Sequence, residues 1–126
     1  MKKLSGTLAI DLGNTNTVVA FQDQKDINPI LLDIPNITSS PGVIPTAVWF
    51  EDPSKILKIG TSALKMRESS NSDSFFHSNF KRLIGNPIEK FNQDKILNPN
   101  ECGEKFFKFL WENIPKKYEI KRLVLT

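Results

Sequence analysis

The chain has 126 residues, of which 39% are apolar and 25% are charged, values that fit one globular domain and exclude a disordered or fibrous protein. One cysteine and one histidine exclude an internal disulfide and argue against a structural metal site. The net charge of +3 comes from scattered basic pairs, and no apolar run approaches the roughly 20 residues that cross a bilayer, so we expect a cytoplasmic protein that binds neither nucleic acid nor membrane.

The first third of the chain carries strand patterns. Two segments rich in apolar and β-branched residues are separated only by Gly13 to Asn16. This spacing predicts a hairpin, because glycine and asparagine tolerate the positive φ angles of tight turns. A segment that begins with proline follows and is typical of an edge strand. The sequence therefore predicts an antiparallel meander of three strands at 7–12, 17–21 and 29–34.

The remainder mixes strands with helices. Further strands are predicted at 46–50, 55–59 and 120–126. Helices are predicted at 62–68, at 101–113, and from Asp73 or Ser74 through Leu83. The helix ending at Leu83 rests on the helical spacing of three apolar residues, Phe76, Phe80 and Leu83. Because the sequence stops inside an apolar strand pattern, we expect it to be a fragment of a longer protein.

The segment from Asp11 to Thr17 is the best candidate for chemistry. A hairpin turn containing Gly13, Asn14, Thr15 and Asn16 presents backbone N–H groups and hydroxyls that can hold phosphate oxygens. Asp11 would hold Mg²⁺ through water, since Mg²⁺ gives up its water ligands reluctantly. An ordinary polar hairpin, in which these side chains bond their own backbone, is an equally good interpretation of the spacing.

Lys81 is the second candidate. On the predicted helix it shares a face with His77 and lies beside the apolar stripe, from where it could stabilise charge on a phosphate. A lysine–arginine pair on a helix is more often simply solvated. We expect His77 to be a surface residue and Cys102 to be a structural, buried cysteine.

Five segments of the chain, in order and at similar spacing, resemble the Hsp70 (DnaK-type) chaperones of the actin-like ATPase superfamily. Asp11–Ala20 is similar to that family's first phosphate loop, and the sequence Phe-Lys-Arg-Leu-Ile-Gly is similar to its Lys-Arg-Leu-Ile-Gly segment. The resemblance covers about residues 5 to 126. The other matching segments are two strands and a strand–glycine step, so that the whole set is 11–20, 44–50, 59–64, 80–85 and 123–126.

The resemblance implies an α/β fold, the N-terminal lobe of an actin-like (ribonuclease H-like) ATPase, with a mixed sheet and a smaller subdomain inserted at about 40–100. It implies that Lys81 is catalytic and positions the attacking water, that Arg82 lines the cleft, and that Asp11 orients Mg²⁺ by way of its water shell. The residues that would contact the phosphates of ATP or ADP are Gly13, Asn14, Thr15, Asn16 and Lys81.

The chain departs from the family at Asn86, where arginine is usual, and in two more serious respects. The family usually has threonine where Asn14 stands, so hydrolysis could be slow or altered. The second lobe and the peptide-binding domain are absent from these 126 residues. We therefore expect the chain alone to be inactive, although the full-length protein would hydrolyse ATP to drive cycles of binding to unfolded polypeptides, assisted by co-chaperones.

Two other interpretations remain open. The Asp11–Thr17 turn is also close to the opening loop of type III pantothenate kinases, small-molecule kinases of the same superfamily, in which asparagine at position 14 would be normal. Alternatively, the chain is a non-catalytic lobe that binds a partner through its sheet edge. A nucleotide-dependent rise in melting temperature would argue against this last interpretation.

Overall fold

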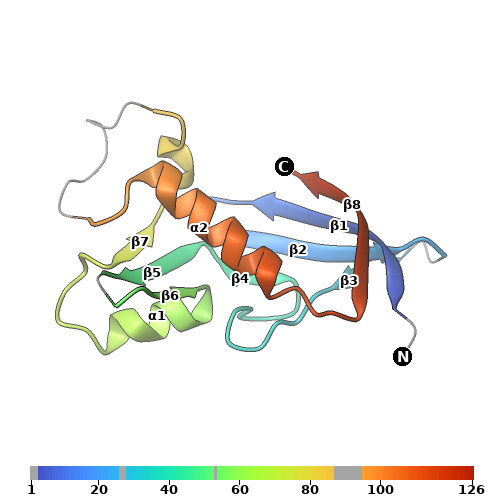
Figure 1. The fold of residues 1–126 in the computed structure, drawn as a ribbon, viewed down its shortest axis with the longest axis horizontal. Coiled ribbons are helices and arrows are strands. Elements are labelled where there is room, and N and C mark those ends of the chain that lie inside the picture. The colour runs from blue at the N-terminus through green and yellow to red at the C-terminus, as the bar shows by residue number, and fades with distance from the viewer. Residues whose placement is uncertain (1–2, 26–27, 53, 87–94) are drawn as a thin grey trace.

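The computed structural model describes residues 3–25, 28–52, 54–86 and 95–126. Within these ranges the chain is a mixed α/β fold with two sheets, and its longer helix lies across the larger sheet (Figure 1). The predicted α/β class is confirmed. The predicted inserted subdomain at 40–100 stays a prediction, and parts of it, residue 53 and residues 87–94, lie outside the described residues.

The larger sheet contains the predicted meander. Strands β1 (Leu4–Leu12), β2 (Asn16–Asp23) and β3 (Ile30–Leu31) pair antiparallel in that order, which confirms the topology. β3 is shorter than predicted because a second strand, β4 (Val43–Pro45), takes the rest of the same β2 edge. On the other side, β8 (Tyr118–Leu125) pairs in parallel with β1, so the sheet is mixed.

The smaller sheet has the order β6–β5–β7. β5 (Ala47–Glu51) is its central strand, between β6 (Ile56–Ile59) and β7 (Phe76–Ser78). Helix α1 (Thr61–Glu68) packs on one face, where Ala63 meets Ala47 and Trp49 of β5. The alternate residues of β5, Val48 and Phe50, join the main core instead. Both faces of this strand are therefore buried.

The predicted helix from residue 73 or 74 through Leu83 is wrong. Its first part is strand β7, whose Phe76 pairs with Trp49 of β5, and only Lys81–Leu83 form a single 3₁₀ turn, η1. Asn79 separates the strand from the turn, and its φ of 55° lies in the left-handed region. The free edge of β5 supplies backbone partners to this segment, and its serines and asparagines have low helix propensity.

Helix α2 (Pro99–Glu112) connects the two parts of the fold. Asn98 and Glu101 form a capping box at its start: the Asn98 side chain accepts from the Glu101 N–H at 2.9 Å, and the Glu101 carboxylate accepts from the Asn98 N–H at 3.0 Å. Phe106 and Leu110 are completely buried, and they pack with residues of both sheets in one core that includes Leu8, Val19, Phe21, Ile44, Val48 and Ile59.

The helices of the described ranges are short or amphipathic. Neither is both long enough and apolar enough to cross a membrane.

Candidate functional site

The turn between β1 and β2 is where the predicted phosphate-contacting residues lie. β1 ends at Leu12 and β2 begins at Asn16, so the turn is tight, and it projects at one end of the larger sheet (Figure 1). The sequence predicts that Gly13 provides a positive φ angle. That prediction is wrong, because none of the turn residues has a positive φ. A Cβ on Gly13 would instead lie 2.2 Å from the carbonyl oxygen of Asn16, so Gly13 is required by a close approach of backbone to backbone.

The turn is held against the junction of β4 and β5. The Thr46 N–H donates to the carbonyl of Thr15 at 2.9 Å. Behind this contact, the hydroxyls of Thr17 and Thr46 form a hydrogen bond of 2.8 Å, and both residues are buried. Thr15 and Asn16 themselves are exposed. The backbone is therefore fixed from behind while the outer side of the turn is open to a ligand.

Asn14 joins the turn to the segment that carries Lys81. Its Nδ2 donates to Oδ1 of Asn79 at 3.1 Å, across 65 residues of sequence. The Oδ1 of Asn14 is buried and has no hydrogen-bond partner among the described residues. Because Asn79 comes two residues before Lys81, this bond fixes the η1 turn beside the hairpin. Sequence reasoning had no signal for this contact, since Asn79 belonged to the predicted helix.

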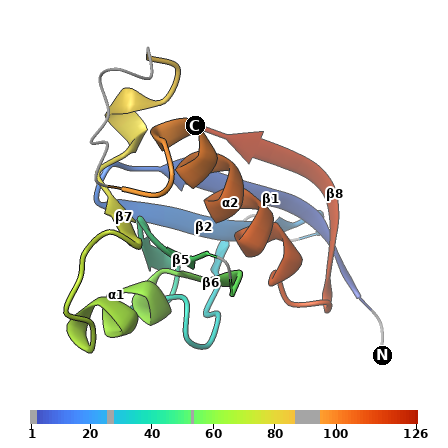
Figure 2. The same ribbon diagram turned by 60° about the vertical axis from the view of Figure 1, so that its left-hand side comes forward.

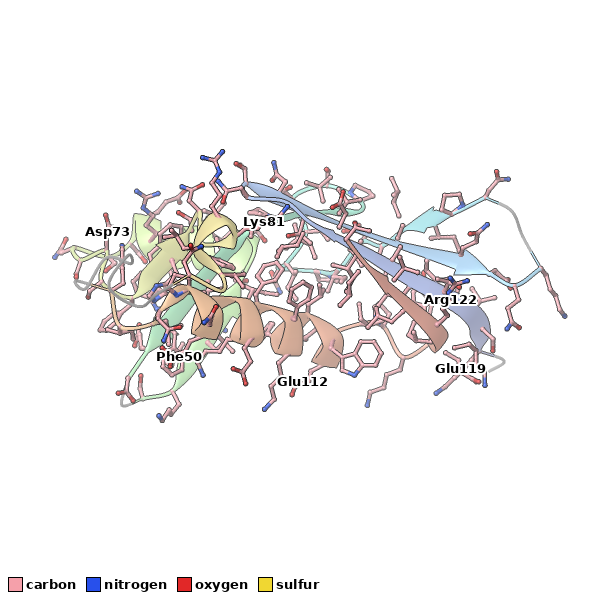
Figure 3. The ribbon with its side chains drawn as sticks, turned by 90° about the horizontal axis from the view of Figure 1, so that it is seen from above. Phe50, Asp73, Lys81, Glu112, Glu119 and Arg122 are labelled. Carbon is pink, nitrogen blue, oxygen red and sulfur yellow. The ribbon has the colours of Figure 1, made fainter. Side chains whose placement is uncertain are left out.

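Lys81 is exposed, and Figure 3 shows it near the end of the β1–β2 hairpin. No ion pair involves it within the described ranges. The expectation that it shares a helical face with His77 is wrong, because the two residues lie in different elements and His77 is 4% exposed. The expectation that His77 is a surface residue is wrong for the same reason. Arg82 is exposed as well.

Asp11 lies near the end of β1 and is exposed. Its Oδ1 accepts a hydrogen bond of 3.1 Å from the hydroxyl of Thr126. A carboxylate offers about four lone-pair directions, so one such bond leaves room for the water ligands of Mg²⁺. No group of three or more metal-ligating side chains occurs in the described part of the chain. Contact with the ion through water fits this donor set better than direct coordination by protein alone.

A cavity of about 270 Å³ adjoins the turn, and Asn14, Thr15 and Asn16 form one of its walls. Arg67 of α1 lines the same cavity and was not among the predicted site residues. Its guanidinium lies 4.7 Å from the centre of the Phe76 ring, and its Nε is 3.6 Å from Asp73 Oδ1. The sequence placed Arg67 on a helix but could not show that α1 faces the turn.

Chemically, the site offers a rigid turn with an open outer side. Two basic side chains, Lys81 and Arg67, and the carboxylate of Asp11 lie nearby. This combination is suited to binding a phosphorylated ligand together with a hydrated cation. Compared with protein-family models and with curated proteins, the chain matches none of them. The functional assignment therefore rests on the site and on the sequence motifs.

Proposed function

We propose that this chain is the ATP-binding N-terminal lobe of an Hsp70-like ATPase with the actin-like (ribonuclease H-like) fold. The observation that carries the proposal is the Asn14–Asn79 hydrogen bond of 3.1 Å, which joins the first motif to the residue directly before the second. The Gly13–Asn16 turn and the Lys-Arg-Leu-Ile-Gly segment are far apart in sequence. The hydrogen bond brings the turn and this segment close together in the fold, and a phosphate site shared by both requires that closeness.

In this proposal the turn from Gly13 to Asn16 contacts the phosphates of ATP or ADP. Asp11 orients Mg²⁺ through its water shell, and Lys81 positions the attacking water and offsets the charge of the transferred phosphoryl group. Lys81 suits this task because it is exposed and has no ion-pair partner within the described ranges. Its ammonium is therefore available to a ligand.

Hydrolysis needs groups that surround the phosphates, and we propose that the second lobe supplies the remainder. The chain alone would then bind nucleotide weakly and not hydrolyse it. In the complete protein, a cytoplasmic chaperone, hydrolysis would drive cycles of binding to unfolded polypeptides with the help of co-chaperones. The exposed apolar residues near β8, which include Leu123, Leu125 and Trp111, favour the presence of a further protein surface there.

The binding step is tested on the chain itself by its melting temperature with and without Mg·ADP. A ligand that binds only the native state raises this temperature, so we expect a saturable rise that disappears without Mg²⁺. Asp11→Asn should weaken the Mg²⁺ dependence. A folded chain whose melting temperature ignores nucleotide at every concentration would contradict the proposal and favour a non-catalytic binding lobe.

The catalytic step is tested in a protein that carries both lobes. We expect Lys81→Ala to reduce ATP turnover by roughly 100-fold or more while leaving the dissociation constant for ATP within a fewfold of its original value. Lys65→Ala, which removes another exposed lysine, is the matched control and should retain turnover. Equal turnover in the Lys81 variant and its parent would overturn the role of this lysine.

A further inference from the structure

A second cavity, of about 210 Å³, lies between β7, the η1 turn and the start of α2. These elements are neighbours in both ribbon views (Figures 1 and 2). Its walls are largely apolar and include Phe76, Phe80 and Leu97, all of them buried. Three nitrogen-bearing side chains, those of His77, Asn79 and Lys95, also line it. The nucleotide proposal uses Asn79 but neither His77 nor Lys95.

The imidazole of His77 lacks a hydrogen bond that a buried group requires. The residue is 4% exposed, and its Nε2 atom has no partner among the described residues. Leaving such an atom unpaired costs about 1–3 kcal/mol, so buried polar atoms are almost always paired in native proteins. His77 is one of the residues that line the cavity, so a ligand held there could supply the acceptor that Nε2 lacks.

Lys95 makes this cavity favourable for negative charge. Its Nζ donates to the carbonyl oxygen of Asp73 at 2.6 Å, which leaves two of the three ammonium protons for other acceptors. Burial, and secondly the positive charge of Lys95, lowers the pKa of His77 to about 4. The imidazole is therefore neutral near pH 7 and can donate one N–H, while the ammonium supplies the positive charge.

The size of the cavity limits its occupant. A dry apolar cavity of about 150 Å³ holds benzene, and one water occupies about 30 Å³ in the liquid. A volume of about 210 Å³ thus fits one ring or a short branched chain with one small polar group. The apolar walls match the hydrocarbon part, and the two nitrogen donors match the oxygens of a carboxylate.

We propose that this cavity is a binding site for a small monocarboxylate with an apolar body, whose oxygens accept hydrogen bonds from His77 Nε2 and Lys95 Nζ. This cavity shares Phe76, Ser78 and Asn79 with the cavity beside the β1–β2 turn, whereas His77 and Lys95 line this cavity alone. Its geometry rests on β7 and α2, which the smaller sheet and the main core hold in place.

The test uses benzoate as a probe, titrated into the whole chain at pH 7 with chloride replaced at constant ionic strength. The readout is the pair of side-chain nitrogen resonances of His77, the only histidine in the sequence. We expect saturable shifts at His77 with a dissociation constant on the order of a millimolar, as befits so small a ligand. Absence of saturable shifts in the folded protein would overturn the proposal.

Two variants and a neutral probe isolate the charge. Lys95→Met should weaken benzoate binding by about tenfold while leaving binding of benzyl alcohol within about twofold. Lys58→Met, at an exposed lysine that does not line the cavity, should change neither. His77→Phe keeps a ring but removes the donor and should weaken both probes. Equal benzoate affinity in the Lys95 variant and its parent would overturn the assignment of a carboxylate.

Discussion

His77 and Cys102 line the same cavity, and burial acts on both in the same direction, toward the neutral form. Burial, followed by the charge of Lys95, lowers the pKa of His77 to about 4. Burial, followed by the charge of Glu101, raises the pKa of the Cys102 thiol to about 12. Cys102 is 2% exposed, which confirms the predicted buried cysteine. Neither residue is therefore ionised at neutral pH in the folded chain.

The lowered pKa of His77 predicts a loss of stability in acid. In the unfolded chain this histidine has an ordinary pKa near 6.5, so it takes up a proton below that pH while the folded form does not. The contribution is complete above pH 6.5 and is lost as the pH falls toward 4. We expect the loss to reach about 3 kcal/mol, measured by urea unfolding at a series of pH values.

The control for this prediction is His77→Gln. Carboxylates titrate in both proteins, so the quantity to compare is the difference between the two stability curves. That difference should change between pH 6.5 and 4 and be flat above pH 7. A parallel pair of curves would show that His77 keeps the same pKa in the folded and unfolded states.

At the scale of elements, local chemistry and tertiary contacts act together at the β1–β2 hairpin. Gly13 permits the close approach of the two strands, because any Cβ there would meet the Asn16 carbonyl. Thr46 and Asn79 then hold the turn from two sides. The turn geometry on which a phosphate site depends is thus set partly by the smaller sheet.

Gly13→Ala tests this view of the hairpin. The Cβ would lie 2.2 Å from a backbone oxygen, and backbone cannot move aside as a flexible side chain can. We expect a loss of about 1–3 kcal/mol in the free energy of unfolding, measured by denaturant titration. If the proposed function is right, the rise in melting temperature caused by Mg·ADP should also disappear.

Gly103→Ala is the matched control, since it also adds one methyl group. Gly103 lies within α2, where alanine is favoured over glycine by about 1 kcal/mol, and its Cβ would meet only the side chain of Ile84, with the Cδ1 atom nearest at 3.0 Å. This variant should be neutral or slightly stabilised. A similar loss from both substitutions would mean that the Gly13 turn is not specially constrained.

At the scale of the whole molecule, one core serves both sheets. Phe106 and Leu110 of α2 pack in the same cluster as Leu8 of β1 and Val48 of β5. Both sheets therefore bury apolar area against the same residues of α2. In Figure 2 the helix is seen to run past both sheets. We expect the described fold to unfold as one cooperative unit.

Phe106→Ala is the corresponding prediction. Phe106 has no exposed surface, and such truncations typically cost about 3–5 kcal/mol. Native-state hydrogen exchange should show the loss equally at amides of β1 and β5, because the cavity opens in a shared core. Lys108→Ala, at an exposed position of the same helix, should change stability little. Weakened protection in one sheet alone would indicate two independent units.

Much of the fold was predictable because the signals were local. Alternation placed β1, runs of β-branched and apolar residues placed β2 and β5, and the amphipathic spacing of Phe106 and Leu110 placed α2. Predictions failed where the pattern suited two structures. The spacing of Phe76, Phe80 and Leu83 matches a helical stripe, but Phe76 is buried from a strand, Phe80 is buried just before the 3₁₀ turn, and Leu83 is only partly buried.

Part of the candidate site was equally accessible to sequence reasoning. Asp11 and the Gly13–Asn16 turn lie within six residues of sequence, so their residue types and spacing suffice to predict a polar hairpin and to mark it as a candidate for phosphate binding. Arg67 and Asn79 carried no such signal. Each reaches the turn only because a different strand or helix packs against it, and single-sequence patterns do not encode those contacts.

The sequence by itself determined the mixed α/β class and the opening hairpin, and it marked candidates for phosphate contact, because periodicity, turn chemistry and motif spacing act over a few residues. Only the tertiary structure decided that residues 76–78 form a strand, that His77 is buried and neutral, and that Asn14 binds Asn79. The physical reason is that these outcomes depend on which free strand edge and which apolar surface a segment meets after the chain has folded.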